Sequence, residues 1–277
     1  MNNNPGPIGV FDSGYGGLTI LKAIRKQLPQ YDYVYLGDNA RAPYGPRSFD
    51  VVYEFTRQAV YSLFEKGCHL VILGCNTASA KALRTIQQSD LPRWDSSRRV
   101  LGVIRPTAEE IGKLTTSRHI GVLATEGTIL SNSYDIEIKK LHPDIVVTGE
   151  PCPLWVPLVE YGEANSDGAD YFVRKYISNI MQRDPKIDTL LLGCTHYPLL
   201  IDKIRQFAPP SVFIMEQGTY VASSLQDYLL RHPEIESRCT RNATLRLFTT
   251  ENPQKFRDHA FTFIGEDIEA SHIDIDG

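Results

Sequence analysis

Two stretches of the chain, "HLVILGCNTASAKAL" (69–83) and "DTLLLGCTHYPLLIDKI" (188–204), have the same form. In each, a short apolar run ends in Gly-Cys and polar residues follow. Such a run predicts a buried β-strand, and the glycine allows the backbone to turn sharply after it. Each stretch therefore predicts a cysteine, Cys75 or Cys194, at the carboxyl end of a strand, where parallel sheets bind ligands.

Strand and helix patterns alternate around these stretches. "PIGVFDSG" (7–14) predicts a strand and a turn, "GLTILKAIRKQLP" (17–29) an amphipathic helix, and "YDYVYLGD" (31–38) the next strand. A helix expected over 49–66 has an apolar face formed by Phe49, Val52, Phe55, Ala59 and Leu63. This βαβα order predicts an α/β fold with a parallel, doubly wound sheet.

The pattern is partly repeated in the second half of the chain. "IGVFDSGYGG" (8–17) resembles "IGVLATEGTI" (120–129), and in each half the Gly-Cys stretch follows in the same order. Two matches in the same order predict two pseudo-symmetric α/β domains. We expect residues 1–100 plus 211–277 to form the first domain, with Cys75, and residues 101–210 the second, with Cys194.

Composition limits the class of partner. The 277 residues are 42% hydrophobic and 22% charged, and their net charge is −4. This charge gives no general reason to expect nucleic acid or an acidic membrane as a partner, although a small anionic substrate remains compatible with it. Because the chain has neither a long apolar segment nor a secretory signal at "MNNNPGP", we expect a cytoplasmic protein.

The number and spacing of the cysteines favour a functional role over disulfide cross-links. There are five, an odd number without a CxxC pair, which disfavours a disulfide framework and a zinc site: Cys68, Cys75, Cys152, Cys194 and Cys239. A lone cysteine is most often a small buried side chain, but two at matching places favour function. Such a pair could be a redox couple, a metal site or an acid/base pair. Only His196 is near enough in sequence to help bind a metal, which disfavours a metal site. An acid/base pair therefore fits the two matched cysteines best.

Polar neighbours surround both cysteines. Asn76 and Thr77 follow the first and Thr195 the second, and such side chains either cap helices or bind a carboxylate. Asp12 and Ser13 end a predicted strand before a Gly-rich turn, which lacks both the dinucleotide-binding spacing and the P-loop lysine. Two further ionisable residues, Glu160 and His196, either flank the thiols or are structural.

Longer motifs resemble the glutamate racemases, the cofactor-independent members of the aspartate/glutamate racemase superfamily. The matching stretches are "DSGYGGLT" (12–19), "YLGDNARAPYG" (35–45), "CNTASA" (75–80), "CPLWVPLVE" (152–160) and "LLGCTHYPLL" (191–200). The resemblance implies two flavodoxin-like domains with the active site in the cleft between them. It also implies that no pyridoxal phosphate, metal or nucleotide takes part, and that the protein is a homodimer.

By this resemblance, Cys75 removes the α-proton of D-glutamate and Cys194 that of L-glutamate, while the opposite thiol returns a proton. The positions that would assist the thiols are Asp12, Glu160 and His196. The positions that would bind substrate are Asp12, Ser13, Tyr44, Gly45, Asn76, Thr77, Thr128, Thr195 and His196. The product, D-glutamate, would serve peptidoglycan synthesis.

Two other classes of function stay open. One keeps the superfamily but changes the substrate: the protein would be an aspartate or hydantoin racemase, or a decarboxylase or isomerase that acts on a related diacid. The other is a binding protein without catalysis, although binding alone does not require two matched thiols.

One stretch departs from the family pattern. Many relatives carry an Asp-Ser-Gly or Asp-Pro turn near residues 215–218, where this chain reads "MEQG". We expect this stretch to lie away from the other motifs, so the difference should affect subunit contacts or a hinge more than catalysis.

Overall fold

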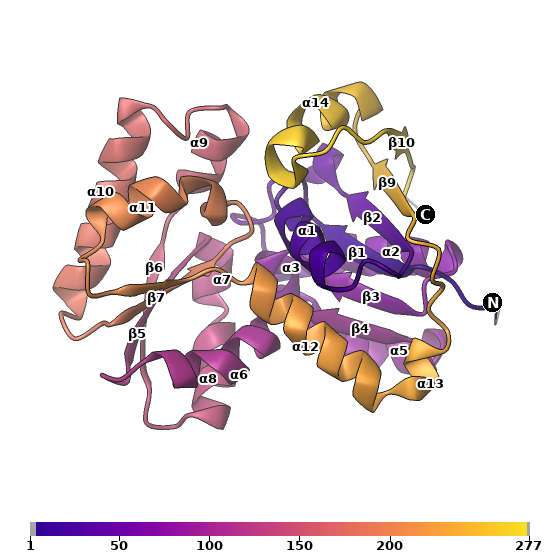
Figure 1. Cartoon of the computed structure of the whole chain (residues 1–277), viewed down its shortest axis with the longest axis horizontal. Helices are drawn as coiled ribbons and strands as arrows, with labels where there is room; N and C mark the ends of the chain where they lie inside the picture. Colours follow the sequence, from indigo (N-terminus) through magenta and orange to yellow (C-terminus); the bar gives the residue numbers. More distant parts are fainter. Residues whose placement is uncertain (1–3, 276–277) are drawn as a thin grey trace.

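The strands form two sheets in which all pairings are parallel (Figure 1). The computed structural model describes residues 4–275. The six-stranded sheet has the order β10-β9-β2-β1-β3-β4, and the four-stranded sheet has the order β6-β5-β7-β8. The strands of the first sheet are β1 (Ile8–Asp12), β2 (Tyr33–Gly37), β3 (Leu70–Leu73), β4 (Arg99–Gly102), β9 (Leu245–Thr249) and β10 (Ala270–His272). Those of the second are β5 (His119–Ala124), β6 (Val146–Pro151), β7 (Thr189–Gly193) and β8 (Phe213–Met215).

Helices connect the strands and cover the sheets, as parallel pairing requires. The first domain contains α1 (Gly17–Gln27), η1 (Asn39–Arg41), α2 (Phe49–Glu65), α3 (Asn76–Lys81), α4 (Leu83–Thr85), η2 (Ile86–Asp90), α5 (Leu91–Trp94), α12 (Gly218–Arg231), α13 (Pro233–Glu236) and α14 (Pro253–Ile264). The second contains α6 (Ile104–Leu114), α7 (Glu126–Leu130), α8 (Ser133–Leu141), α9 (Trp155–Glu160), α10 (Asp167–Arg183), η3 (Tyr197–Leu200) and α11 (Ile201–Phe207).

The two domains are built on one plan. The orders β2-β1-β3-β4 and β6-β5-β7-β8 are equivalent, so β1 corresponds to β5 and β3 to β7. Cys75 follows β3, and Cys194 follows β7. The prediction of two pseudo-symmetric, doubly wound parallel sheets is therefore confirmed, and β9 and β10 extend the first sheet beyond the shared plan.

The chain crosses between the domains twice, from β4 to α6 and from β8 to α12. These crossings do not match the expected boundaries at residues 100 and 211. β4 runs to Gly102 and pairs with β3, whereas β8 pairs with β7, so residues 213–215 belong to the second sheet rather than to the first. A strand of three residues is too short for its sequence to indicate which sheet edge it joins.

Apolar residues form a core that extends across both domains. Leu18 of α1 and Leu225 of α12 belong to the same cluster as Leu190 of β7 and Ile177 of α10. A second cluster lies on the α2 side of the first sheet, and a third lies between α6, α8 and the second sheet. The domains thus share apolar packing in addition to two chain crossings.

The apolar face predicted for α2 is correct in its middle and wrong at its start. Val52, Ala59 and Leu63 are buried, but the Phe49 side chain is 47% exposed. Phe49 is the first residue of the helix, after the N-cap Ser48, and Lys81 Nζ lies 5.0 Å from the centre of its ring. Within residues 4–275, no helix is both long and apolar enough to span a bilayer.

Candidate active site

Cys75 is held at the junction between strand and helix. It is 6% exposed, and its Sγ accepts a hydrogen bond from the Ala78 N–H at 3.4 Å, as the N-cap of α3. Burial raises the pKa of the Cys75 thiol to about 12, and the negative charges of Asp12 and Cys194 add to this effect. Cys75 is therefore a thiol at neutral pH.

Two residues at the carboxyl end of β1 lie beside Cys75. The Ser13 Oγ is 3.5 Å from Cys75 Sγ. The Asp12 carboxylate accepts a hydrogen bond from the Gly14 N–H at 2.8 Å. Burial raises the pKa of Asp12, although the positive charge of His196 and the Gly14 N–H act in the opposite direction. The end of β1 therefore places a carboxyl group and a hydroxyl group near the first thiol.

Cys194 has a different partner. It is also 6% exposed, and its Sγ lies 3.9 Å from His196 Nδ1, while His196 Nε2 lies 2.9 Å from Glu160 Oε1. Burial alone would lower the pKa of His196, but its hydrogen bonds to Cys194 and Glu160 outweigh this and raise the pKa to about 10. His196 is therefore an imidazolium at neutral pH, and this cation lies between the Cys194 sulfur and the Glu160 carboxylate.

Threonine hydroxyls from the two domains meet next to Cys75. Thr77 Oγ1 lies 2.9 Å from Thr125 Oγ1 and 3.4 Å from Thr128 Oγ1. Thr125 was absent from the residues expected at the site. The internal repeat contains a signal for it, because aligning "IGVFDSG" with "IGVLATEG" places Thr125 opposite Ser13.

The remaining predicted residues also lie where the domains meet. Tyr44 is buried, and its hydroxyl donates its proton to the Asp38 carboxylate. The Gly45 carbonyl accepts a hydrogen bond from the Gly127 N–H at 3.0 Å. The Thr195 carbonyl accepts one from Thr19 Oγ1 at 3.0 Å.

Gly16 allows this close approach of the domains. A Cβ at Gly16 would lie 2.2 Å from Thr195 Oγ1 and 2.5 Å from His196 Nδ1. These separations are far below van der Waals contact, so only glycine fits between α1 and the Cys194 loop.

The stretch that departs from the family pattern contacts the site directly. Gln217 accepts a hydrogen bond from Asn76 Nδ2 at 2.8 Å and is itself buried. The expectation that this stretch lies away from the catalytic motifs is therefore wrong. The contact joins residues 141 positions apart, a separation that local sequence patterns do not reveal.

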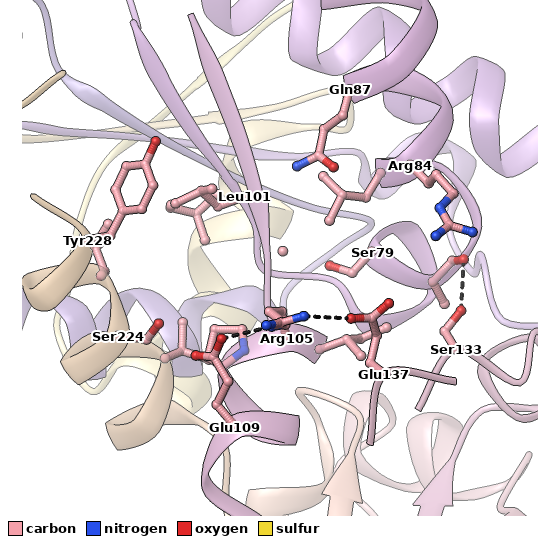
Figure 2. A pocket seen from close by; sticks show the side chains of 18 of the residues that line it. Ser79, Arg84, Gln87, Leu101, Arg105, Glu109, Ser133, Glu137, Ser224 and Tyr228 are labelled. Carbon is pink, nitrogen blue, oxygen red and sulfur yellow. Dashed lines mark hydrogen bonds and ion pairs between the residues drawn. The ribbon is translucent and has the colours of Figure 1, made fainter. Parts of the chain in front are cut away.

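Two cavities lie near the domain junction. One, of about 500 Å³, is lined by Cys194, Thr195, Gln217 and residues of α1 and α14. The other, of about 610 Å³, is lined by residues that include Ser79, Leu101 and Tyr228 (Figure 2). Figure 2 shows Arg105 of this second cavity between two carboxylates, Glu109 at 2.8 Å and Glu137 at 3.4 Å. Its lining contains no cysteine, so the second cavity is separate from the thiols.

Metal-ligating side chains are not grouped in the described part of the chain. Among residues 4–275, no three or more His, Cys, Asp or Glu side chains are placed to hold a metal ion together.

Fold and site together define a class: a two-domain α/β enzyme in which each domain brings one cysteine to the junction. The model of the Asp/Glu/hydantoin racemase family matches residues 15–215. The chain is 39% identical over 280 residues to a glutamate racemase of Streptococcus thermophilus, covering 100% of this chain and 98% of that protein. It is 38% identical to a glutamate racemase of Dinoroseobacter shibae, covering 95% and 97%.

Solved structures give the same result. Glutamate racemase isoform RacE1 from Bacillus anthracis superposes with a TM-score of 0.88 at 34% identity, covering 97% of each chain. The glutamate racemase of Francisella tularensis in complex with D-glutamate has a TM-score of 0.86 at 32% identity, covering 100% of this chain and 99% of that one. The chain belongs to the Asp/Glu/hydantoin racemase family and is an isomerase that acts on an amino acid.

Proposed function

We propose that this protein interconverts L-glutamate and D-glutamate with Cys75 and Cys194 as its two bases. The observation that carries this proposal is the placement of the two thiols at equivalent strand ends, buried at one domain junction and with different charged neighbours. The names of the relatives and the D-glutamate complex of one of them support glutamate as the substrate.

The reaction requires stabilisation of negative charge. The α-hydrogen of an amino acid is a weak acid, and its removal places charge on the α-carboxylate. Asn76, Thr77 and Thr195 are polar groups suited to bind that carboxylate in a site that excludes water. Because two bases on opposite domains face opposite sides of the α-carbon, neither has to move during the reaction.

The two sulfurs have different neighbours. Cys75 is a thiol at neutral pH, whereas Cys194 lies 3.9 Å from the imidazolium of His196. Racemisation of L-glutamate starts with Cys194 as the thiolate and Cys75 as the thiol: Cys194 takes the α-proton, and Cys75 gives its own proton to the opposite face. D-glutamate leaves with Cys75 as the thiolate and Cys194 as the thiol, which is the state that takes the α-proton from D-glutamate. Cys75 regains a proton from solvent and Cys194 loses one to solvent when the starting state is restored without a reverse turnover.

The test is α-proton exchange in heavy water. Wild-type protein without added cofactor should form D-glutamate from L-glutamate and incorporate deuterium at the α-carbon. Either Cys75→Ala or Cys194→Ala should lower racemisation by at least about 10³-fold, since each removes a proton-transfer group. Cys239→Ala is the matched control, because this thiol is also buried and donates to the Ile235 carbonyl, outside the proposed site. Full activity in a Cys75 or Cys194 variant would exclude that residue from the mechanism.

Aspartate is the main alternative substrate. A panel of L-glutamate, L-aspartate and a hydantoin at equal concentration separates these candidates. A higher kcat/KM for aspartate would overturn the assignment to glutamate.

The proposed cellular setting follows from the proposed reaction. We propose a cytoplasmic homodimer that needs no added cofactor and supplies D-glutamate for peptidoglycan. Growth of a D-glutamate-requiring bacterium that expresses this chain would support the role, and molar mass in solution decides the subunit number.

A further inference from the structure

Three buried side chains at the domain junction form a closed ring of hydrogen bonds. Asn76 Nδ2 donates to Gln217 Oε1 at 2.8 Å, and Gln217 Nε2 donates to the Tyr134 hydroxyl oxygen at 2.6 Å. The Tyr134 hydroxyl in turn donates to Asn76 Oδ1. Each member therefore donates one bond and accepts one within the ring.

The ring has a single sense. All three residues are only 3% exposed, so water does not compete for their polar groups. The sense is fixed at Gln217, because Thr107 Oγ1 donates its proton to the Val103 carbonyl at 2.8 Å and therefore accepts a bond from Gln217 Nε2. With Nε2 directed to Thr107 and Tyr134, Gln217 Oε1 faces the Asn76 nitrogen, and the Asn76 oxygen faces Tyr134.

Gln217 connects this ring to both chain crossings. It immediately precedes α12, on the return crossing, while Tyr134 lies on α8 of the second domain and Asn76 starts α3 of the first. Its Nε2 also donates to Thr107 Oγ1 at 2.8 Å, on the α6 helix of the outgoing crossing. One side chain thus links both domains and both crossings.

The ring leaves a specific atom of Asn76 for the substrate. A side-chain amide has two N–H groups, and within residues 4–275 the Asn76 amide uses only one, in its bond to Gln217. The remaining N–H is a donor, as binding of a carboxylate requires. A reversed amide would present its oxygen and repel the carboxylate.

We propose that Gln217 is a positioning residue for racemisation, which acts by holding the Asn76 amide with a donor towards the substrate carboxylate. This inference rests on the proposed function, because it assigns Asn76 to that carboxylate. Since Asn76 directly follows Cys75, the same contact also fixes the start of the helix that carries the first thiol.

The decisive experiment is a double-mutant cycle with Gln217→Met and Asn76→Ala. Gln217→Met keeps the shape of the side chain but removes both polar atoms. We expect kcat on L-glutamate to fall by about tenfold with a smaller change in KM, because the bond to the carboxylate strengthens as charge develops. In the Asn76→Ala background, Gln217→Met should change kcat by less than about twofold, since the group through which it acts is absent.

Two further variants complete the design. Tyr134→Phe removes the hydroxyl that closes the ring and should lower kcat as Gln217→Met does. This variant tests the proposal even if Gln217→Met does not fold. The matched control is Gln27→Met, because Gln27 bonds to Ser223 and Gln226 of α12 at an exposed contact. Its kcat should equal that of the wild type.

The outcomes separate this proposal from the function on which it rests. If Gln217→Met folds and keeps the wild-type kcat, or lowers kcat equally with and without Asn76, the positioning role is overturned while the racemase assignment stands. If the wild type does not racemise glutamate, both fall together.

Discussion

The charge of the His196 side chain depends on two neighbours that act in the same direction. Glu160 approaches one ring nitrogen and Cys194 the other, and both contacts favour the imidazolium against the cost of burial. The imidazole ring therefore links the Glu160 carboxylate to the Cys194 sulfur. In the proposed mechanism, proton transfer at Cys194 depends on this carboxylate, which does not itself contact the sulfur.

Glu160→Gln should narrow the pH range of activity. The pKa of His196 is raised to about 10, so the imidazolium persists up to that pH and is lost above it. Without the Glu160 carboxylate the His196 imidazolium is less stable, so the pKa of His196 falls. The alkaline limb of the kcat/KM profile should therefore move to lower pH. The measurement is a pH profile of kcat/KM for α-deuterium incorporation from about pH 6 to about pH 10.5.

The control is Glu163→Gln, in the loop after α9. An alkaline limb that stays in place in Glu160→Gln, or that moves equally in both variants, would contradict the link between Glu160 and His196.

At the scale of elements, the sequence correctly predicted features that depend on residues close together in the chain. The Gly-Cys stretches follow β3 and β7 as expected, because apolar runs and turn glycines reflect burial and backbone geometry. The edge to which β8 belongs and the contact between Gln217 and Asn76 depend on distant parts of the chain. Phe49 is exposed because the first turn of α2 lies beyond the packed part of the helix, which periodicity alone does not indicate.

Asp32 holds the segment before β9 against the start of β2. Its carboxylate accepts hydrogen bonds from the Thr244 N–H at 2.9 Å and from Asn242 Nδ2 at 2.7 Å. Burial alone would raise the pKa of Asp32, but the bonds from Thr240, Thr244 and Asn242 hold it well below its usual range. The ionised carboxylate therefore stabilises the fold above the unfolded-state pKa of about 4, and this contribution is lost as pH falls.

Asp32→Asn should lower the free energy of unfolding by about 1–3 kcal/mol at neutral pH, since a charged acceptor is lost. The difference from wild type should shrink at about pH 3, where wild type has already lost part of this contribution. Urea denaturation at the two pH values measures the difference in the free energy of unfolding. The control is Asp227→Asn, because Asp227 forms an exposed ion pair with Arg231. An equal difference at both pH values would rule out the ionised Asp32 as its source.

At the scale of the whole molecule, both sulfurs are buried where the domains meet, each 6% exposed. We predict that the domains separate to admit substrate and close again for catalysis. Gly127 lies at the point of closure, where an added Cβ would be 2.4 Å from the Gly45 carbonyl oxygen and 2.6 Å from Lys81 Nζ.

Gly127→Ala should impair closure without unfolding either domain, because alanine is favoured over glycine in a helix such as α7. Misplacement by about 1 Å is costly for catalysis, so we expect kcat/KM to fall by about tenfold or more. Steady-state kinetics together with thermal unfolding measure the two effects. Gly168→Ala is the control, since its Cβ would meet only Ser166 Oγ at 3.4 Å; unchanged kcat/KM in Gly127→Ala would show that closure tolerates the methyl group.

The position of β9 between β2 and β10 also affects how the chain folds during synthesis. One edge of β2 pairs with Leu245–Thr249, which leave the ribosome more than two hundred residues after β2 itself. Until then β2 exposes unpaired backbone groups, as edge strands do, while every strand of the second sheet has already been made. The amino-terminal domain is thus begun first and completed last, and the nascent chain must protect an open strand edge for most of its translation.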